Sequence, residues 1–268
     1  MKYVVDKDIY ITIKGNPHAI IKYKDYAKRL HEIPILSYQM SIDGLENWHD
    51  HMRSPGSFKN TLNAFKLLNQ EGITTVAKMT VSQENKDMVP QVFKLCEKNL
   101  IDFFGISRLV CTSNAAVNAQ KTLNASEFQE IMRSLWEINS KNMQKIFYDP
   151  LWIPYLMATN RISIPNFNNI NIVSEGCTIW EDSFSIMANG DLYACSRIPE
   201  SKVCNCLEIE PDDIDNNSKL YYFRNPTDNF KCTKCKFFYL CRGCRAVAYA
   251  QYGNYFAHDP ACCYFTEV

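Results

Sequence analysis

Residues 232–263 read CTKCKFFYLCRGCRAVAYAQYGNYFAHDPACC, and this stretch governs how the rest of the chain is interpreted. It holds four cysteines in the spacing C-x2-C-x5-C-x2-C, namely Cys232, Cys235, Cys241 and Cys244. A further pair, Cys262 and Cys263, follows Asp259-Pro260. Thiolates are soft ligands that suit zinc and iron-sulfur clusters, and C-x2-C lets one turn of chain present two sulfurs to one centre. The stretch therefore predicts a metal centre.

Upstream, Cys177 and Cys195 flank Gly190 in the spacing C-x12-G-x4-C, so eight of the twelve cysteines stand at short-range ligand spacing. A disulfide framework is one alternative, but the opening MKYVVDKDIY is too polar for the apolar region of a secretory signal. A structural zinc ribbon is a second alternative, which explains the central quartet and leaves Cys177 and Cys195 unused. Iron-sulfur ligation accounts for both groups and ranks first.

The cysteine-rich region resembles a known domain, the SPASM domain that follows the catalytic barrel of many radical S-adenosylmethionine (SAM) enzymes. The string CTIWEDSFSIMANGDLYACSRIPES, residues 177–201, is similar to its first half, and residues 231–262 are similar to its second half. The resemblance implies two auxiliary 4Fe-4S clusters held by cysteine thiolates. The short last interval in CRGCRAVAY, residues 241–249, is similar to the heme-pathway branch of the family.

The resemblance also implies how the ligands divide. The cluster nearer the barrel would take Cys177, Cys195 and Cys244. The other cluster would take Cys232, Cys235, Cys241 and a final cysteine. The DPAC string makes Cys262 the better match for this last ligand, with Cys263 as the alternative. Where relatives carry a fourth ligand for the first cluster, this chain has Ser183, so the cluster has an open iron or takes Cys204 or Cys206.

Composition limits the remaining function classes. A chain of 268 residues that is 46% hydrophobic can bury one substantial core and a smaller one, so one or two domains are expected. The formal net charge of zero argues against a generic nucleic-acid or membrane-surface binder. No apolar run approaches the roughly 20 residues of a spanning helix. Twelve cysteines without an export signal indicate a reducing compartment, and we expect a cytoplasmic protein.

The first 150 residues alternate between strand and helix patterns. Strands are expected at Ile9–Ile13, Ile33–Ile42, Ile73–Val81 and Ile101–Val110, and helices at 22–31, 57–72, 88–96 and 128–138. Four such alternations predict parallel strands with right-handed crossovers, an α/β fold. Ligands of such sheets bind at the carboxyl ends of the strands.

The loop after the second strand, SIDGLENWHDHMRSPGS, residues 41–57, resembles the radical SAM segment SIDG…HD…R…GSF. That match makes Ser41 and Arg53 candidate contacts for the methionine end of SAM. A guanidinium pairs bidentately with a carboxylate, and a hydroxyl at a strand end accepts a hydrogen bond from an amine. The alternative is that Arg53 is a surface residue.

Other residues near the strand ends receive structural interpretations. Asp43-Gly44 is expected to form a tight turn, and His49 and His51 are expected to be surface loop residues. Arg108, late in the fourth strand, is left open between a substrate or cofactor role and a structural one. Cys96 and Cys111 are expected in the apolar core.

One departure from the family concerns catalysis. Radical SAM enzymes hold their catalytic 4Fe-4S cluster with C-x3-C-x2-C after the first barrel strand, but the first cysteine here is Cys96. The segment DIYITIKGN, residues 8–16, corresponds to about the third strand of the six-unit barrel, so the chain is expected to begin after the catalytic loop. Truncation, division between two polypeptides, and a degenerate protein are the three accounts, and truncation is favoured. This polypeptide is not expected to cleave SAM by itself.

The resulting prediction is an α/β protein with a partial radical SAM (β/α) barrel at 1–147, a connector at 148–169 and a small cysteine-rich SPASM domain at 170–268. The implied function is all or part of a peptide- or protein-modifying maturase with SAM and two auxiliary 4Fe-4S clusters. Its partners would be a peptide or protein substrate, an electron donor such as ferredoxin or flavodoxin and, if the protein is split, a chain that supplies the missing half of the barrel. The alternative is a non-catalytic iron-sulfur module that transfers electrons or presents a peptide.

Overall fold

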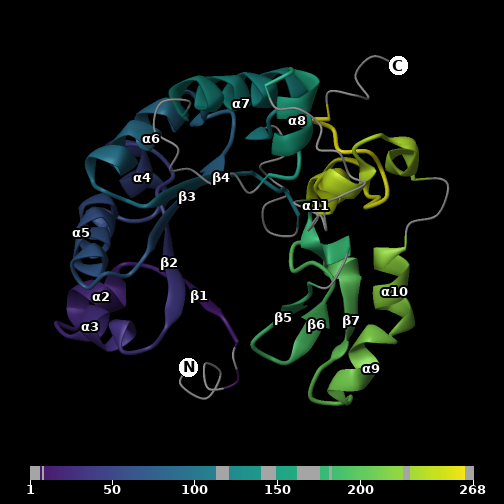
Figure 1. The fold of residues 1–268 in the computed structure, drawn as a ribbon, viewed down its shortest axis with the longest axis horizontal. Helices are drawn as coiled ribbons and strands as arrows, with labels where there is room; N and C mark the ends of the chain where they lie inside the picture. Colours follow the sequence, from purple (N-terminus) through teal and green to yellow (C-terminus); the bar gives the residue numbers. More distant parts are fainter. Residues whose placement is uncertain are drawn as a thin grey trace. The chain divides into compact units, whose positions relative to one another are not determined.

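The computed structural model describes residues 7, 9–112, 121–139, 149–161, 176–180, 183–225 and 230–262. The chain divides into two compact units (Figure 1). Unit 1 comprises Met1–Ser107 and Ile131–Tyr148, and unit 2 comprises Arg108–Glu130 and Asp149–Val268. Of the predicted connector at 148–169, the structure describes residues 149–161, and the rest lies outside the described residues. Within the described ranges, no helix is both long and apolar enough to cross a bilayer.

Unit 1 is built on a four-stranded sheet in the order β1-β2-β3-β4. The strands are β1 (Ile11–Lys14), β2 (Ile35–Ser41), β3 (Thr75–Val81) and β4 (Phe103–Arg108). β1 pairs with β2, and β2 with β3, in parallel. The crossovers contain α2 (His18–Lys22), α3 (Tyr26–His31), α4 (Glu46–Met52), α5 (Ser57–Gln70), a 3-10 turn at Lys86–Met88 and α6 (Val89–Lys98), and α7 (Ala125–Asn139) follows β4. The predicted α/β fold with a parallel sheet is confirmed.

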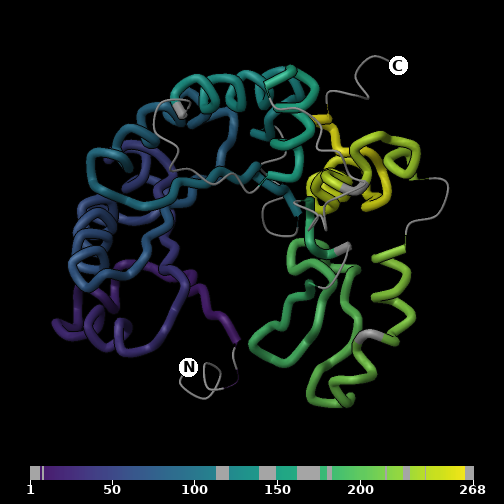
Figure 2. Tube along the Cα trace, viewed as in Figure 1, coloured from purple at the N-terminus to yellow at the C-terminus, as the bar shows by residue number. Residues whose placement is uncertain are grey.

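Apolar periodicity explains the core of unit 1. The α5 side chains of Phe58, Phe65 and Leu68 are buried, as their helical spacing predicts. Phe93 of α6 meets Phe104 of β4 edge to face, with ring centroids 6.0 Å apart. Figure 2 traces these crossovers as coils that return the chain to neighbouring strands. Cys96, 1% exposed, is a core residue as expected.

Two local predictions for unit 1 need correction. The helix predicted at 22–31 is two short helices, because Tyr23 adopts an extended conformation between α2 and α3. The loop predicted after the second strand contains α4. This helix was missed because its Leu45 N-cap position supplies no side-chain hydrogen bond, so the sequence carries no start signal there.

Unit 2 contains a three-stranded antiparallel sheet in the order β5-β6-β7. Its strands are β5 (Ser185–Ile186), β6 (Asp191–Tyr193) and β7 (Lys202–Asn205). The predicted hairpin is confirmed, with its turn at Gly190, whose φ of 84° favours glycine. The helices are α8 (Trp152–Ala158), α9 (Pro211–Asp215), α10 (Ser218–Arg224) and α11 (Arg245–Tyr252). Short 3-10 turns lie at Thr178–Trp180, Pro199–Ser201, Lys231–Lys234 and Phe238–Leu240.

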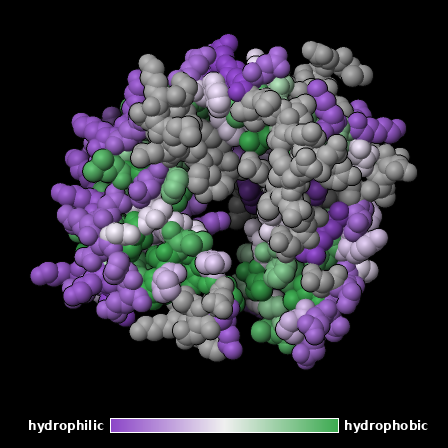
Figure 3. All heavy atoms as spheres, viewed as in Figure 1, coloured by the Kyte–Doolittle hydropathy of each residue, from purple (hydrophilic) through white to green (hydrophobic). Residues whose placement is uncertain are grey.

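The antiparallel sheet of unit 2 packs on α10 through one apolar face. Leu192, Val203, Leu220 and Phe223 form this small core. Exposed apolar side chains remain on the same sheet region, which carries green atoms in Figure 3. They are Phe184, Ile186, Met187 and Leu207.

Candidate functional site

Four cysteines of unit 2 line one pocket, and we call them the pocket set: Cys232, Cys235, Cys241 and Cys262. The remaining lining is largely apolar and includes Leu151, Phe237 and Phe238. Backbone N–H groups point at two of the sulfurs, from Phe237 to Cys235 Sγ at 3.5 Å and from Gly243 to Cys241 Sγ at 3.3 Å. Such donors stabilise a thiolate more than a thiol. The pocket therefore offers four sulfur ligands, and the Asp259 carboxylate, paired with Arg108, also lines it.

The backbone of the pocket set is held in turns. Cys232 lies within the 3-10 turn at Lys231–Lys234 and Cys235 directly follows it, with the Cys235 N–H donating to the Cys232 carbonyl at 2.9 Å. Gly243 has a φ of 61°, and a Cβ at this position would lie 2.6 Å from the Cβ of Asp259. The C-x2-C of Cys241 and Cys244 therefore requires glycine at position 243.

Three further cysteines form the second predicted ligand group, and we call them the hairpin set: Cys177, Cys195 and Cys244. Burial raises the pKa of the Cys177 thiol to about 12, and the neighbouring sulfurs of Cys244 and Cys195 act in the same direction. Burial likewise raises the pKa of Cys195, and Cys244 adds to that shift. Cys177 and Cys195 both pack against Ile179 and Phe230.

The pocket set shows the same electrostatics. Burial raises the pKa of Cys232 to about 11, although the Arg245 guanidinium opposes the shift. Burial also raises the pKa of Cys241 well above its ordinary value, with Cys262 and Cys232 adding to the rise. Sulfurs that repel one another as thiolates are compatible with a cationic iron core between them.

The structure thus places the pocket set around one pocket and packs Cys177 and Cys195 in one apolar cluster, while the division of the ligands and iron ligation stay predictions. Among the described residues, no three His, Cys, Asp or Glu side chains converge as single-ion ligands do. A 4Fe-4S cluster carries its own sulfides between the irons and the thiolates, so its ligands need not meet at one point. Four sulfur donors in a largely apolar pocket fit a 4Fe-4S cluster.

The cysteines predicted as alternative fourth ligands of the hairpin set lie in a different apolar cluster. Cys204 and Cys206 pack against the Leu192 core rather than against Phe230. Burial raises the pKa of Cys204, with added effects from Cys206 and Glu208. The geometry therefore gives no support to either sulfur as a ligand of the hairpin set. Cys263 lies outside the described residues.

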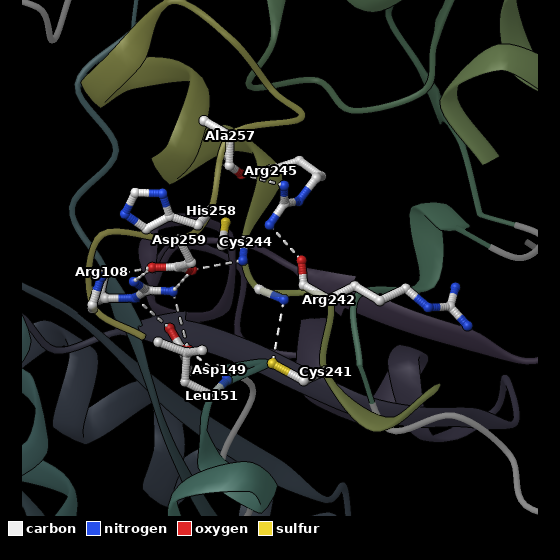
Figure 4. A network of polar contacts seen from close by, with 12 residues as sticks. Arg108, Asp149, Leu151, Cys241, Arg242, Cys244, Arg245, Ala257, His258 and Asp259 are labelled. Carbon is white, nitrogen blue, oxygen red and sulfur yellow. Dashed lines mark hydrogen bonds and ion pairs between the residues drawn. The ribbon is translucent and has the colours of Figure 1, made fainter. Parts of the chain in front are cut away.

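Arg108 connects both cysteine sets through buried ion pairs, drawn in Figure 4. Its Nε lies 2.8 Å from Asp149 Oδ2, and its Nη1 lies 2.6 Å from Asp259 Oδ1. Asp259 Oδ2 also accepts from the Cys244 N–H at 2.7 Å, and the Asp259 carbonyl accepts from the Cys262 N–H at 2.9 Å. Two carboxylates engage the Arg108 guanidinium, so the structural role predicted for Arg108 is favoured over a substrate or cofactor role.

At the other candidate site, in unit 1, Arg53 is paired with Asp43. Arg53 Nε and Nη2 lie 2.8 and 2.6 Å from Asp43 Oδ2, and Nη1 takes no part in this pair. Asp43 is therefore more than a turn residue, because it fixes the arginine. The Arg53 side chain is 46% exposed and lines an open cavity of about 620 Å³ together with His18 and Ser57. Ser41 is the half-buried last residue of β2.

The prediction of a surface position for His49 was wrong. Its side chain is buried, because α4 turns it inward. Nδ1 accepts from the Asp43 N–H at 3.2 Å, so Nε2 carries the proton and donates to Ser57 Oγ at 3.3 Å. Asp50 accepts from the N–H groups of Gly56 and Phe58, each at 2.7 Å, at the start of α5. His49 and Asp50 thus both bond to the start of α5, and these bonds close the loop that carries Arg53.

The protonation of His49 gives a testable pH dependence. Burial lowers the pKa of His49 below 6.5, and Arg53 acts in the same direction while Asp43 and Asp50 oppose it. The unfolded chain therefore takes up the proton first, and the stabilisation from neutral His49 is complete above pH 6.5 and lost as the pH falls through the folded pKa. Replacing His49 with asparagine is expected to flatten the fall in the thermal midpoint between about pH 7.5 and 5. His51→Asn, at an exposed position of the same helix, is the control. Equal slopes for wild type and His49→Asn would contradict this.

No protein-family model matches the sequence. The AdoMet-dependent heme synthase of Nitratidesulfovibrio vulgaris is 25% identical over 98% of this chain and 73% of its own length. The sporulation killing factor maturation protein SkfB of Bacillus subtilis is 26% identical over 74% of this chain and 44% of its own length.

The fold matches part of a longer solved chain. The structure of native anSMEcpe with bound AdoMet and the Cp18Cys peptide superposes with a TM-score of 0.70 at 16% identity, over 97% of this chain and 72% of that one. At this identity the likeness establishes the fold alone, an α/β fold with a parallel sheet and a cysteine-rich carboxy-terminal region. Together with the curated relatives, it supports a radical SAM/SPASM-like family for the chain.

Proposed function

We propose that this chain binds the methionine end of SAM and two auxiliary 4Fe-4S clusters as all or part of an enzyme that modifies a peptide or protein. Four cysteines that are up to 30 positions apart in the sequence line one pocket of unit 2, and this observation carries the proposal. The hairpin set would hold the second cluster. Ferredoxin or flavodoxin is the proposed electron donor, and the cytoplasm the proposed location.

Bound SAM would supply a carbon-centred radical for hydrogen abstraction only where a catalytic 4Fe-4S cluster, whose C-x3-C-x2-C ligands are not among residues 1–268, gives it one electron. Residues of this chain would hold the methionine end of SAM in place. Arg53, oriented by Asp43, has its Nη1 group outside the ion pair and directed by a fixed guanidinium plane, which suits a carboxylate. The hydroxyl of Ser41, at the end of β2, would accept from the amine.

Equilibrium dialysis with labelled SAM tests this assignment. Arg53→Lys keeps the charge but loses the planar fork, and a hydrogen bond to a charged group contributes about 1.5–3 kcal/mol. SAM binding is therefore expected to weaken by about tenfold to a hundredfold. The control is Arg29→Lys, an exposed position on α3. Unchanged affinity in Arg53→Lys would remove Arg53 from the site.

The peptide substrate is supported by two of the similar proteins. SkfB is by name the maturation protein of a sporulation killing factor, and the anSMEcpe structure contains the Cp18Cys peptide. A porphyrin is the second candidate, because the heme synthase relative covers 98% of the chain. Titration with an iron porphyrin that bears carboxylate side chains separates the two. A saturable shift of its absorption band at one equivalent would favour the porphyrin, and no shift would favour the peptide.

The non-catalytic alternative rests on the absence of C-x3-C-x2-C from residues 1–268. Measuring release of 5′-deoxyadenosine from SAM, by this chain alone and with candidate partner chains added, discriminates between the two functions. Release in either mixture supports the enzyme, whereas its absence with intact auxiliary clusters supports the electron-transfer or peptide-presenting module.

A further inference from the structure

Asp43 holds two side chains of unit 1 in place, one through its carboxylate and one through its backbone. The carboxylate fixes the guanidinium of Arg53, with Oδ2 lying 2.8 Å from Nε and 2.6 Å from Nη2. The backbone N–H of Asp43 donates to Nδ1 of His49 at 3.2 Å. Asp43 is 7% exposed and His49 is 1% exposed, so water has little access to the bond between them.

This bond decides which nitrogen of His49 carries the proton. A backbone N–H can only donate, so Nδ1 is an acceptor and the neutral ring carries its proton on Nε2. Nε2 lies 3.3 Å from Oγ of Ser57 and donates to it. Since the Ser57 oxygen accepts this bond, its own O–H is left to donate to a different group.

The Ser57 hydroxyl belongs to the cavity that Arg53 lines. Ser57 is half-buried at the first position of α5, and both residues line the open cavity of about 620 Å³. Within the described ranges, His49 is the one hydrogen-bond partner of this hydroxyl, so its proton is available to a ligand in the cavity. Among the described residues that line the cavity, none is Asp or Glu. A carboxylate on the ligand therefore suits the Ser57 hydroxyl and the Nη1 group of Arg53 together.

We propose that Ser57, oriented by His49, is a second hydrogen-bond donor to the carboxylate of SAM, beside Arg53. The inference rests on the proposed function, because that function assigns Arg53 to the same carboxylate. Asp43 orients both donors before the ligand binds, through its carboxylate for Arg53 and through its N–H and His49 for Ser57. Such preorganisation lowers the entropy lost on binding. His49 is a positioning residue in this account, since it acts through Ser57.

Equilibrium dialysis of the full chain with labelled SAM and with decarboxylated SAM tests the assignment. Decarboxylated SAM keeps the amine and the sulfonium and lacks the carboxylate. Ser57→Ala is expected to weaken SAM binding by about tenfold, as the loss of one hydrogen bond to a charged group does, and to leave the affinity for decarboxylated SAM unchanged. Ser57→Thr keeps the hydroxyl and is expected to bind SAM like the wild type. Ser54→Ala is the matched control, because Ser54 lines the same cavity and is not one of the two groups that bond to the His49 ring.

The orienting role of His49 has a separate readout. His49→Asn retains an acceptor for the Asp43 N–H and removes the donor to Ser57. It is expected to weaken SAM binding by about threefold, as the loss of one neutral hydrogen bond does. In the Ser57→Ala background the same change is expected to have no further effect. Additive losses in the double variant would show that His49 does not act through Ser57.

Unchanged SAM affinity in Ser57→Ala, with the loss in Arg53→Lys present, would overturn the role of Ser57 and leave the proposed function standing. Equal weakening of both ligands by Ser57→Ala would show a structural effect, which also overturns the proposal. If decarboxylated SAM does not bind the wild type measurably, Ser57→Thr decides: wild-type affinity for SAM supports the proposal, and a loss equal to that of Ser57→Ala contradicts it. A wild-type chain that does not bind SAM would instead refute the proposed function.

Discussion

Replacing Cys232 and Cys235 together with alanine is expected to remove about half of the iron and acid-labile sulfide from the protein. Both sulfurs line the same pocket, so one cluster would lose two of its four thiolates while the hairpin set stays intact. Iron and sulfide are measured per chain after anaerobic purification, alongside the ultraviolet circular dichroism that reports the fold.

The control removes the same number of thiols from the same unit. Cys204→Ala with Cys206→Ala takes away two sulfurs that pack on the Leu192 core, and the iron content is expected to stay at the wild-type value. Unchanged iron in Cys232→Ala/Cys235→Ala would refute the ligand assignment. Equal losses in both double variants would show that the effect is one of folding.

Arg108→Met is expected to destabilise unit 2 by about 3–5 kcal/mol, since it leaves two buried carboxylates without their cation. Asp149 and Asp259 are 6% and 1% exposed, and neither can regain water in the folded state. Loss of Arg108 should also loosen the Asp259 carboxylate that holds the Cys244 N–H, and lower the iron content with it. Urea denaturation followed by circular dichroism measures the first effect.

Lys202→Met provides the comparison for Arg108→Met. It breaks an ion pair of unit 2 with Asp191, at 2.7 Å, whose lysine is 49% exposed. Exposed pairs contribute little, so the urea midpoint is expected to change only slightly. If Arg108→Met were as stable as Lys202→Met, the three-residue network would not be the support that the geometry indicates.

The features that the sequence predicts are those with local periodicity. Alternating strand and helix patterns specify the parallel sheet, and the spacing of Phe58, Phe65 and Leu68 specifies the buried face of α5. The Asn189-Gly190 turn specifies the hairpin. Cysteine spacing and the SPASM resemblance together predict the pocket set, whose four sulfurs line one pocket.

The unpredicted features depend on partners far apart in the chain. Arg108 meets Asp149 across 41 positions and Asp259 across 151, and no local pattern encodes either pairing. His49 is buried because a short helix without a capping side chain forms after β2, and a polar residue in a polar segment gives no indication of burial. The orientation of Arg245 depends on carbonyls at positions 242, 255 and 257, which become neighbours only when the cysteine-rich turns fold.

Mössbauer spectroscopy of the protein reconstituted with ⁵⁷Fe without oxygen tests the central claim most directly, that the two cysteine sets bind iron and sulfide. The account predicts about eight irons per chain, all in the quadrupole doublets of 4Fe-4S clusters. A colourless preparation with stoichiometric zinc, no acid-labile sulfide and no cluster doublet would contradict it.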